Sequence, residues 1–209
     1  MFKRKPPTTP KESEVAMISW AEIVPDAPYP MSAEEFDRLL DDGWQYELIR
    51  GRLVRMPGNM GNSTIAMRLG GRLSAYVEPR GLGYVGGGDG FFRFTLPDET
   101  KLNTAAPNVS FTQSARAPQP GTRAFYQPWL LVPDLAVEIA SPHQNLADKI
   151  TLWLAAGVQL LWVIYPQERR MQVWRPGESA PSLILGMADT LDALEVVPGF
   201  RLPVRDLLV

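Results

Sequence analysis

The chain of 209 residues contains no cysteine and a single histidine, His143. The lack of cysteine excludes disulfides, thiolate zinc sites and cysteine nucleophiles. The single histidine excludes metal sites with several histidine ligands, so any catalytic metal must be held by oxygen atoms. No run of about eighteen apolar residues is present, which excludes a membrane-spanning helix. Metal-dependent chemistry therefore remains open only through carboxylate, amide or hydroxyl ligands.

The charges nearly balance, with 21 Lys and Arg against 23 Asp and Glu and a net charge of −2 at pH 7. Contact with nucleic acid must therefore come from a local patch. The first residues carry a short basic run, are proline-rich and lack the apolar region of a signal peptide. We expect residues 1–30 to form a flexible arm of a cytoplasmic protein, either a solvated tail or a phosphate-seeking segment, and residues 31–209 to form one folded domain.

Capping motifs and apolar periodicity outline the folded region. Ser32 followed by Glu35 forms a capping box, which predicts a helix. Phe36, Leu39 and Leu40 are expected on its apolar face. The other expected elements are a hairpin of 44–49 and 53–56, a helix over 63–77, strands within 81–95, a strand over 108–112, a strand over 130–140, a helix from an Asn145 cap to Ala156 with Gly157 as its stop, a hairpin of 160–165 and 171–175, and strand-like segments toward 203–208. This mixture predicts an α/β fold with helices around a central mixed sheet.

A carboxylate inside an apolar strand gives the first indication of chemistry. In PDLAVEIASP (133–142), the alternation of side chains along a strand places Asp134 and Glu138 on one face. An isolated buried carboxylate must be paired, protonated or bound to a cation. On the strand alone, a wet strand end or an arginine partner explains Glu138 as well.

The helix after this strand adds a lysine. Lys149 shares a helical face with Trp153 and Ala156 at four- and seven-residue spacing. Helical side chains lean toward the N-terminus of their helix, so Lys149 is expected to reach back to the strand end that carries Glu138. A carboxylate for a hard cation beside an ammonium that can hold a phosphate oxygen suits phosphodiester hydrolysis. A structural salt bridge would contain the same two residues.

Several motifs occur together in a characteristic order. They are YELIRGRLV (46–54), APNVSF (106–111), PDLAVEIASP (133–142), DK (148–149), AGV (156–158), WVI (162–164) and PGFRLP (198–203). With these motifs, residues 31–208 resemble the Uma-two family of restriction-endonuclease-like proteins, part of the PD-(D/E)XK nuclease superfamily. The resemblance implies a mixed sheet flanked by helices, which displays an acidic cluster for magnesium and a lysine.

The resemblance also implies roles for individual residues. Glu138 would be a metal ligand, Lys149 the catalytic lysine moved from the strand to the following helix, and Glu47 a supporting acid. In related nucleases the aspartate of a Pro-Asp-Val motif is the central metal ligand, but this chain has Asn108 at that position. Asparagine offers one neutral carbonyl oxygen, so metal binding is expected to weaken and cleavage with it. Asn62 is a second departure, since a histidine is common there.

Three functions stay open at this point. The first is a DNA endonuclease dependent on Mg²⁺ or Mn²⁺, in which Glu138, aided by Asn108 and Glu47, holds the metal and Lys149 steadies the attacking water. The second is a cleavage-deficient relative that binds nucleic acid or regulates a partner through the same cleft. The third is an interaction protein without a nucleic-acid role. Cutting both strands of DNA asks for two active sites, which favours a homodimer.

Other residues give weaker indications. Tyr126 and Trp129, in the polar loop before residue 130, could stack on a base. Asp89 and Asp98 could replace the missing acid, although both lie in turn-like segments. The glycine-rich segment 86–90 is expected to be a flexible turn, since it lacks the lysine of a phosphate-binding loop.

Overall fold

A computed structural model of the chain describes residues 24, 26–39, 41–56, 58–141, 146–193 and 196–208. Most of the expected arm, together with Leu40, His143 and the expected cap Asn145, lies outside the described residues. In the described part, no helix has both the length and the apolar character needed to cross a membrane.

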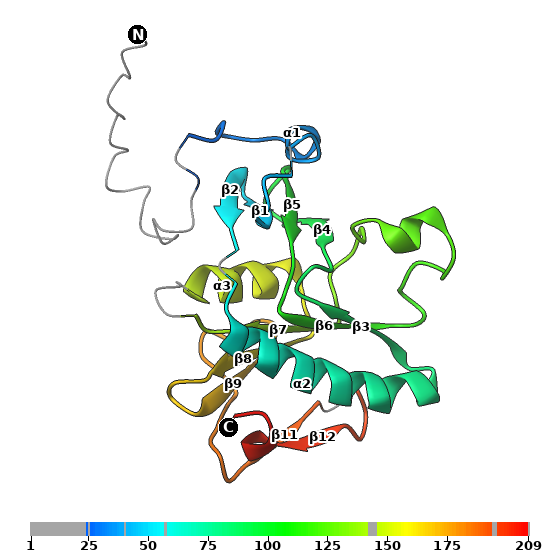
Figure 1. Cartoon of the computed structure of the whole chain (residues 1–209), viewed down its shortest axis with the longest axis vertical. Helices are drawn as coiled ribbons and strands as arrows, with labels where there is room; N and C mark the ends of the chain where they lie inside the picture. Colours follow the sequence, from blue (N-terminus) through cyan, green and yellow to red (C-terminus); the bar gives the residue numbers. More distant parts are fainter. Residues whose placement is uncertain are drawn as a thin grey trace.

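A mixed sheet of six strands forms the centre of the described structure, in the order β10-β9-β8-β7-β6-β3 (Figure 1). Its strands are β3 Gly83–Gly87, β6 Val109–Gln113, β7 Leu135–Ile139, β8 Leu160–Tyr165, β9 Arg170–Trp174 and β10 Leu183–Leu185. β7 and β8 run parallel, and the other neighbouring pairs of this sheet are antiparallel. A parallel pair needs a crossover connection, which α3 (Leu146–Ala156) provides between β7 and β8.

A second sheet, in the order β2-β1-β5-β4, and a small β11-β12 hairpin complete the strands of the described residues. The elements outside the central sheet are α1 Ala33–Phe36, β1 Tyr46–Ile49, β2 Arg52–Arg55, α2 Met60–Val77, η2 Glu78–Arg80, β4 Phe92–Thr95, β5 Leu102–Ala105, η3 Arg123–Tyr126, β11 Thr190–Asp192, β12 Arg201–Pro203 and η4 Val204–Asp206. β1 and β2 meet at Arg50 and Gly51, whose φ angles of 53° and 77° suit the tight hairpin that the sequence predicted.

Two apolar cores lie on opposite faces of the central sheet. α2 and the C-terminal hairpin cover one face, whereas α3 and β4 cover the other (Figure 1). Successive residues of β7 alternate between these cores, since Leu135 and Val137 belong to the first and Ala136 to the second. The same alternation directs Glu138 to the α3 side, where Lys149 and Trp153 lie. The architecture confirms the expected α/β fold with helices flanking a mixed sheet.

Some expected element boundaries are wrong. The Ser32–Glu35 capping box is present, but α1 ends at Phe36, so Leu39 is not on a helical face and is exposed. α2 begins at Met60 because Asn59 caps it by accepting a hydrogen bond from the Asn62 amide.

Two further boundaries differ toward the C-terminus. The strand expected over 130–140 begins only at Leu135. Leu130 precedes it in a loop and is exposed, and Pro133 has no N–H for a strand ladder. Beyond β12, a 3₁₀ turn from Val204 to Asp206 replaces the expected strand-like end.

Candidate functional site

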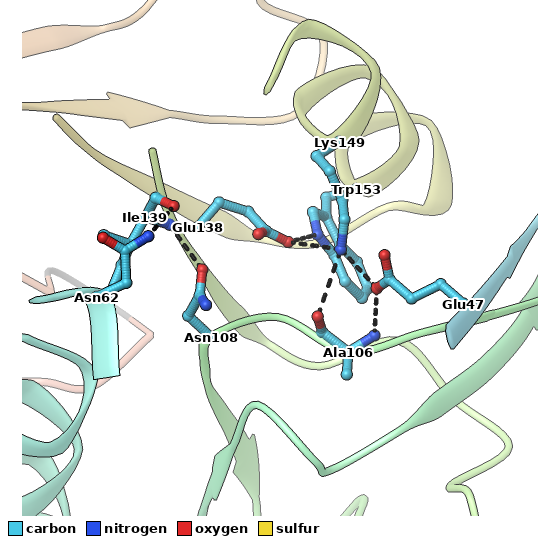
Figure 2. Close-up of polar contacts among 8 residues, drawn as sticks. All are labelled: Glu47, Asn62, Ala106, Asn108, Glu138, Ile139, Lys149 and Trp153. Carbon is cyan, nitrogen blue, oxygen red and sulfur yellow. Dashed lines mark hydrogen bonds and ion pairs between the residues drawn. The ribbon is translucent and has the colours of Figure 1, made fainter. Parts of the chain in front are cut away.

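Three charged side chains meet in the interior, although charged residues are almost never fully buried unless paired. Glu47 of β1, Glu138 of β7 and Lys149 of α3 are 1%, 2% and 7% exposed. The Lys149 ammonium lies 2.5 Å from Glu47 Oε1 and 3.4 Å from Glu138 Oε1 (Figure 2). The structure therefore brings together three of the four site residues predicted from the sequence. Their chemical roles remain predictions.

Glu47 is fixed from two sides. The backbone amide of Ala106 donates a hydrogen bond of 2.8 Å to Glu47 Oε1, the same oxygen that Lys149 contacts. Lys149 also donates to the carbonyl oxygen of Ala106 at 3.4 Å. The segment after β5 thus positions both an acid and an amine, and it leads directly to Asn108.

Trp153 orients Glu138. Its indole N–H donates a hydrogen bond of 2.6 Å to Glu138 Oε1, and the ring itself is fully buried. The sequence placed Trp153 on the same helical face as Lys149 but gave it no role in the site. Its four-residue spacing from Lys149 was the available indication, because residues at that spacing share a helical face.

Two carboxylates share one ammonium at this site. Burial raises the pKa of Glu138, Lys149 opposes that rise and Glu47 adds to it. Burial lowers the pKa of Lys149, but Glu138 and Glu47 together outweigh burial and raise it. The site therefore holds more negative than positive charge when both carboxylates are ionised, which favours a further cation.

Asn108 stands apart from this charged group. Its Oδ1 accepts a hydrogen bond of 2.7 Å from the backbone amide of Ile139, as Figure 2 shows. Within the described residues, Asn108 makes no hydrogen bond with Glu47, Glu138 or Lys149. An aspartate would carry a second oxygen where asparagine carries an NH₂ group, and an NH₂ group is a donor that binds no cation.

Asn62, the second departure from the family pattern, holds the end of β7. Its side-chain amide donates to the carbonyl oxygens of Ile139 and Ala140 at 3.1 and 3.3 Å and to Ser141 Oγ at 2.9 Å. Asn62 and Asn108 therefore both fix the backbone just after Glu138 (Figure 2). Sequence reasoning missed this shared task, because it depends on α2 and β6 meeting the same strand end.

A cleft opens in front of Asn108. It has a volume of about 580 Å³ and runs between α2 and the glycine-rich β3. Among its described lining residues, Asp89 is the only charged one. The expected turn at 86–90 is partly wrong, since β3 extends to Gly87 and only residues 88 and 89 form the turn.

The donors match a hard divalent cation in kind but fall short in charge. Glu47 and Glu138 offer carboxylate oxygens and Asn108 offers an amide oxygen, the ligand types that Mg²⁺ and Mn²⁺ accept. Across the described residues, however, no group of three or more acidic or histidine side chains is placed to hold a metal ion. Neither Asp89 nor Asp98 therefore completes such a group.

Asp134, which the sequence predicted on the same strand face as Glu138, lies just before β7 and belongs to a different environment. It is fully buried and forms an ion pair with Arg116. It also accepts hydrogen bonds of 2.8 Å from the backbone amide of Gln113 and from the side-chain amide of Gln159. Its ionic and hydrogen-bonding needs are met without Glu47 or Lys149, so we assign it a structural task.

Most of the chain matches a known protein family. Residues 33–205 match the Uma2 family, whose description is "Putative restriction endonuclease". The chain belongs to the Uma2 family. The resemblance inferred from the motifs is therefore confirmed.

A solved structure supports the fold of this Uma2 protein. It is described as "a putative nuclease belonging to DUF820" from Anabaena variabilis and superposes with a TM-score of 0.71 at 23% sequence identity. The similarity covers 85% of this chain and 97% of that chain. At this identity the likeness establishes the fold, which agrees with a restriction-endonuclease-like architecture. No curated protein matches the chain.

Proposed function

We propose that this protein is an endonuclease of DNA phosphodiester bonds that depends on Mg²⁺ or Mn²⁺ and whose activity is held low by Asn108. The observation that carries the proposal is the contact of 3.4 Å between Lys149 and Glu138 at the strand end next to Asn108. By the family resemblance, this pair would correspond to the lysine and the metal-ligand acid of the nuclease motif. An acid for the cation and an ammonium for the phosphate then lie at the same strand end.

The proposed roles follow from the contacts. Lys149 would hold a phosphate oxygen or steady the attacking water, and Glu47 would position the ammonium through their 2.5 Å contact. Glu138, oriented by Trp153, would hold the metal together with the Asn108 amide oxygen. The chemistry that such a cation supplies is activation of water and neutralisation of charge on the phosphate.

One observation favours a second candidate, a cleavage-deficient protein that binds nucleic acid or regulates a partner through the same cleft. The only side-chain oxygen of Asn108 already accepts the hydrogen bond from Ile139. The charge of a third acid is also missing among the described residues. In this alternative the protein keeps the nuclease fold but no longer binds the metal ion that cleavage requires.

Cleavage of supercoiled plasmid with Mg²⁺ or Mn²⁺ separates the two candidates. We expect slow nicking by the natural chain and an increase of about tenfold or more in Asn108→Asp, because a carboxylate restores a charged ligand. Asn59→Asp is the matched control. It adds the same charge in the same cleft, and aspartate caps α2 equally well.

The outcomes are distinct. Activity that is unchanged in Asn59→Asp and disappears in Lys149→Met, assayed at a temperature where circular dichroism shows that variant folded, supports the nuclease. Cleavage by Asn108→Asp alone favours the cleavage-deficient candidate. Cleavage that survives Lys149→Met, or its absence in every variant, contradicts the proposed centre.

We further propose that the protein acts as a homodimer, since cutting both strands of a duplex requires two centres. Molar mass from light scattering should then be twice that of the 209-residue chain. A monomeric mass with double-strand cleavage would contradict the dimer.

A further inference from the structure

An aromatic pocket lies beside the cleft, next to the edge strand β3. Its volume is about 570 Å³, within the range of roughly 300–1,000 Å³ typical of small-molecule sites. Its aromatic lining consists of Tyr84 of β3, Phe91, Phe92 of β4, Phe125 and Tyr126 of η3, and Trp129. The loop that carries η3 stands beside β3 and β4 in Figure 1.

The aromatic walls are held in place before any ligand binds. Tyr84 and Phe125 pack edge to face with ring centroids 5.5 Å apart, and Phe125 lies 5.6 Å from Trp129. The Trp129 backbone is fixed by hydrogen bonds with Phe91 and Arg93, at 3.0 and 2.8 Å. A fixed aromatic surface loses little conformational entropy when a flat ring stacks on it.

A buried hydroxyl of this pocket has no partner. Thr112 is 1% exposed and lines the pocket, and its Oγ1 makes no hydrogen bond in the structure. Such groups are rare because they cost free energy, and a polar atom of a ligand would satisfy this one once the side chains that cover the oxygen shift. The pocket therefore combines stacking surfaces with an unused hydrogen-bonding group.

The charges of the lining indicate which part of a nucleotide would fit. The described lining contains no lysine or arginine, and Asp89 is its only charged residue. A phosphate would meet no cation here. A neutral planar ring with N–H groups would find a carboxylate acceptor in Asp89 and a hydroxyl in Thr112.

The pocket and the cleft share one wall. Val85, Gly86, Gly87 and Asp89 line both, so the glycine-rich end of β3 separates the two spaces. A Cβ atom at Gly86 would lie 2.6 Å from Ser110 Oγ, so a side chain there would require the Ser110 hydroxyl to move. A base held in the pocket would therefore lie next to the space in front of Asn108.

We propose that the aromatic pocket binds one unpaired base of the DNA substrate. The inference rests on the proposed nuclease function and extends it to substrates with single-stranded or unpaired nucleotides. Tyr126 and Trp129 provide the stacking surfaces, and Thr112 and Asp89 contact the ring edge.

Binding of a fluorescent single-stranded oligonucleotide to the full chain tests this proposal, with EDTA present so that no cleavage occurs. A second oligonucleotide has the same backbone with abasic sites. We expect the natural chain to bind the base-bearing strand about tenfold more tightly than the abasic strand. Tyr126→Ala should reduce this ratio toward one, and its side chain is 77% exposed, so folding should be unaffected.

Two further variants sharpen the test. Thr112→Val removes the hydroxyl with little change of shape, and it should reduce the ratio while leaving the melting temperature unchanged or higher, since that hydroxyl has no partner. Leu130→Ala is the matched control, because Leu130 is 79% exposed in the same loop but does not line the pocket. It should leave the ratio at the natural value.

Equal affinity for the two strands in the natural chain, or tighter binding of fully paired duplex than of single strand, overturns the pocket proposal. Neither result affects the proposed nuclease function, which is measured by plasmid cleavage in Asn108→Asp. Conversely, base discrimination without cleavage in any variant supports the pocket and contradicts the nuclease.

Discussion

Two buried carboxylates, Asp134 and Glu138, lie at opposite ends of strand β7 and have different polar partners. Asp134, just before the strand, is matched with one cation, Arg116, whose side chain is 39% exposed. Its remaining hydrogen bonds come from the Gln113 amide and the Gln159 side chain. Glu138, near the other end, shares the buried Lys149 with a second carboxylate.

The difference separates a structural carboxylate from a functional candidate. At Asp134, charge is balanced and Arg116 reaches solvent, so that region needs no ligand. At Glu138, two carboxylates face one ammonium, and burial raises the Glu138 pKa. An excess of buried negative charge costs stability unless a cation or a proton offsets it, and active sites often carry such a cost.

Breaking the ion pairs should give the largest contrast. Lys149→Met leaves Glu47 and Glu138 buried without their cation, so we expect the free energy of unfolding to fall by about 3–5 kcal/mol. Arg116→Met is the matched change, and Asp134 keeps two hydrogen-bond donors there, so we expect a loss of only about 1–2 kcal/mol. Urea denaturation at pH 7 measures both. Equal losses would contradict the contrast.

Replacing Glu138 or Asp134 by its amide should reduce stability by less than removing the cations does. Here the larger loss is expected at Asp134 and the smaller one at Glu138. Both contacts of Glu138, from Trp153 and Lys149, fall on Oε1, an atom that Gln retains. We therefore expect Glu138→Gln to cost less than about 1 kcal/mol. Asp134→Asn should cost about 1–3 kcal/mol, because both carboxylate oxygens accept hydrogen bonds and an NH₂ group would face a donor.

A double variant checks the reason for this reversal. In a chain that carries Lys149→Met, the change Glu138→Gln should recover part of the lost stability, since it removes one of two unpaired buried charges. Urea denaturation of the single and double variants gives the coupling free energy. A double variant less stable than Lys149→Met alone would show that charge excess is not what distinguishes the two regions.

The contact between Lys149 and Glu138 could be predicted from sequence because it depends on two local periodicities. Alternation along β7 selects the face of Glu138, and helical geometry turns Lys149 toward it. Glu47 was found only through the family resemblance, because the hairpin that carries it is distant in sequence and no local pattern connects it to Lys149. The hydrogen bond of Asn108 depends on strand register, which the sequence does not state.

The fold shows the same division between local and long-range information. The capping box at Ser32 was predicted, but the length of α1 was not, because a short helix depends on tertiary packing for its extent. The unpartnered hydroxyl of Thr112 could not be predicted at all. It arises where β6 meets the loop around Trp129, and composition gives no indication of that meeting.

A third carboxylate, Asp148 beside Lys149, allows the smallest test of the comparison. Its Oδ2 is buried without a hydrogen-bond partner, and burial raises its pKa from the usual 3.8 to about 6, against an opposing effect of Arg50. A raised pKa means that the folded state binds the proton more tightly than the unfolded state. Stability is therefore lost as the pH rises from about 4 through about 6.

Asp148→Asn should remove this pH dependence, since asparagine carries no charge that burial could penalise. We expect its melting temperature to exceed that of the natural chain by about 2 °C at pH 7.5, a small gain because the side chain is partly exposed. The difference should shrink toward zero near pH 4, where Asp148 is already protonated. Thermal unfolding across this pH range measures it. A difference in melting temperature that is the same at every pH would mean that burial does not penalise the charged form of Asp148. Asp148 would then resemble Asp134, whose charge is balanced by its partners.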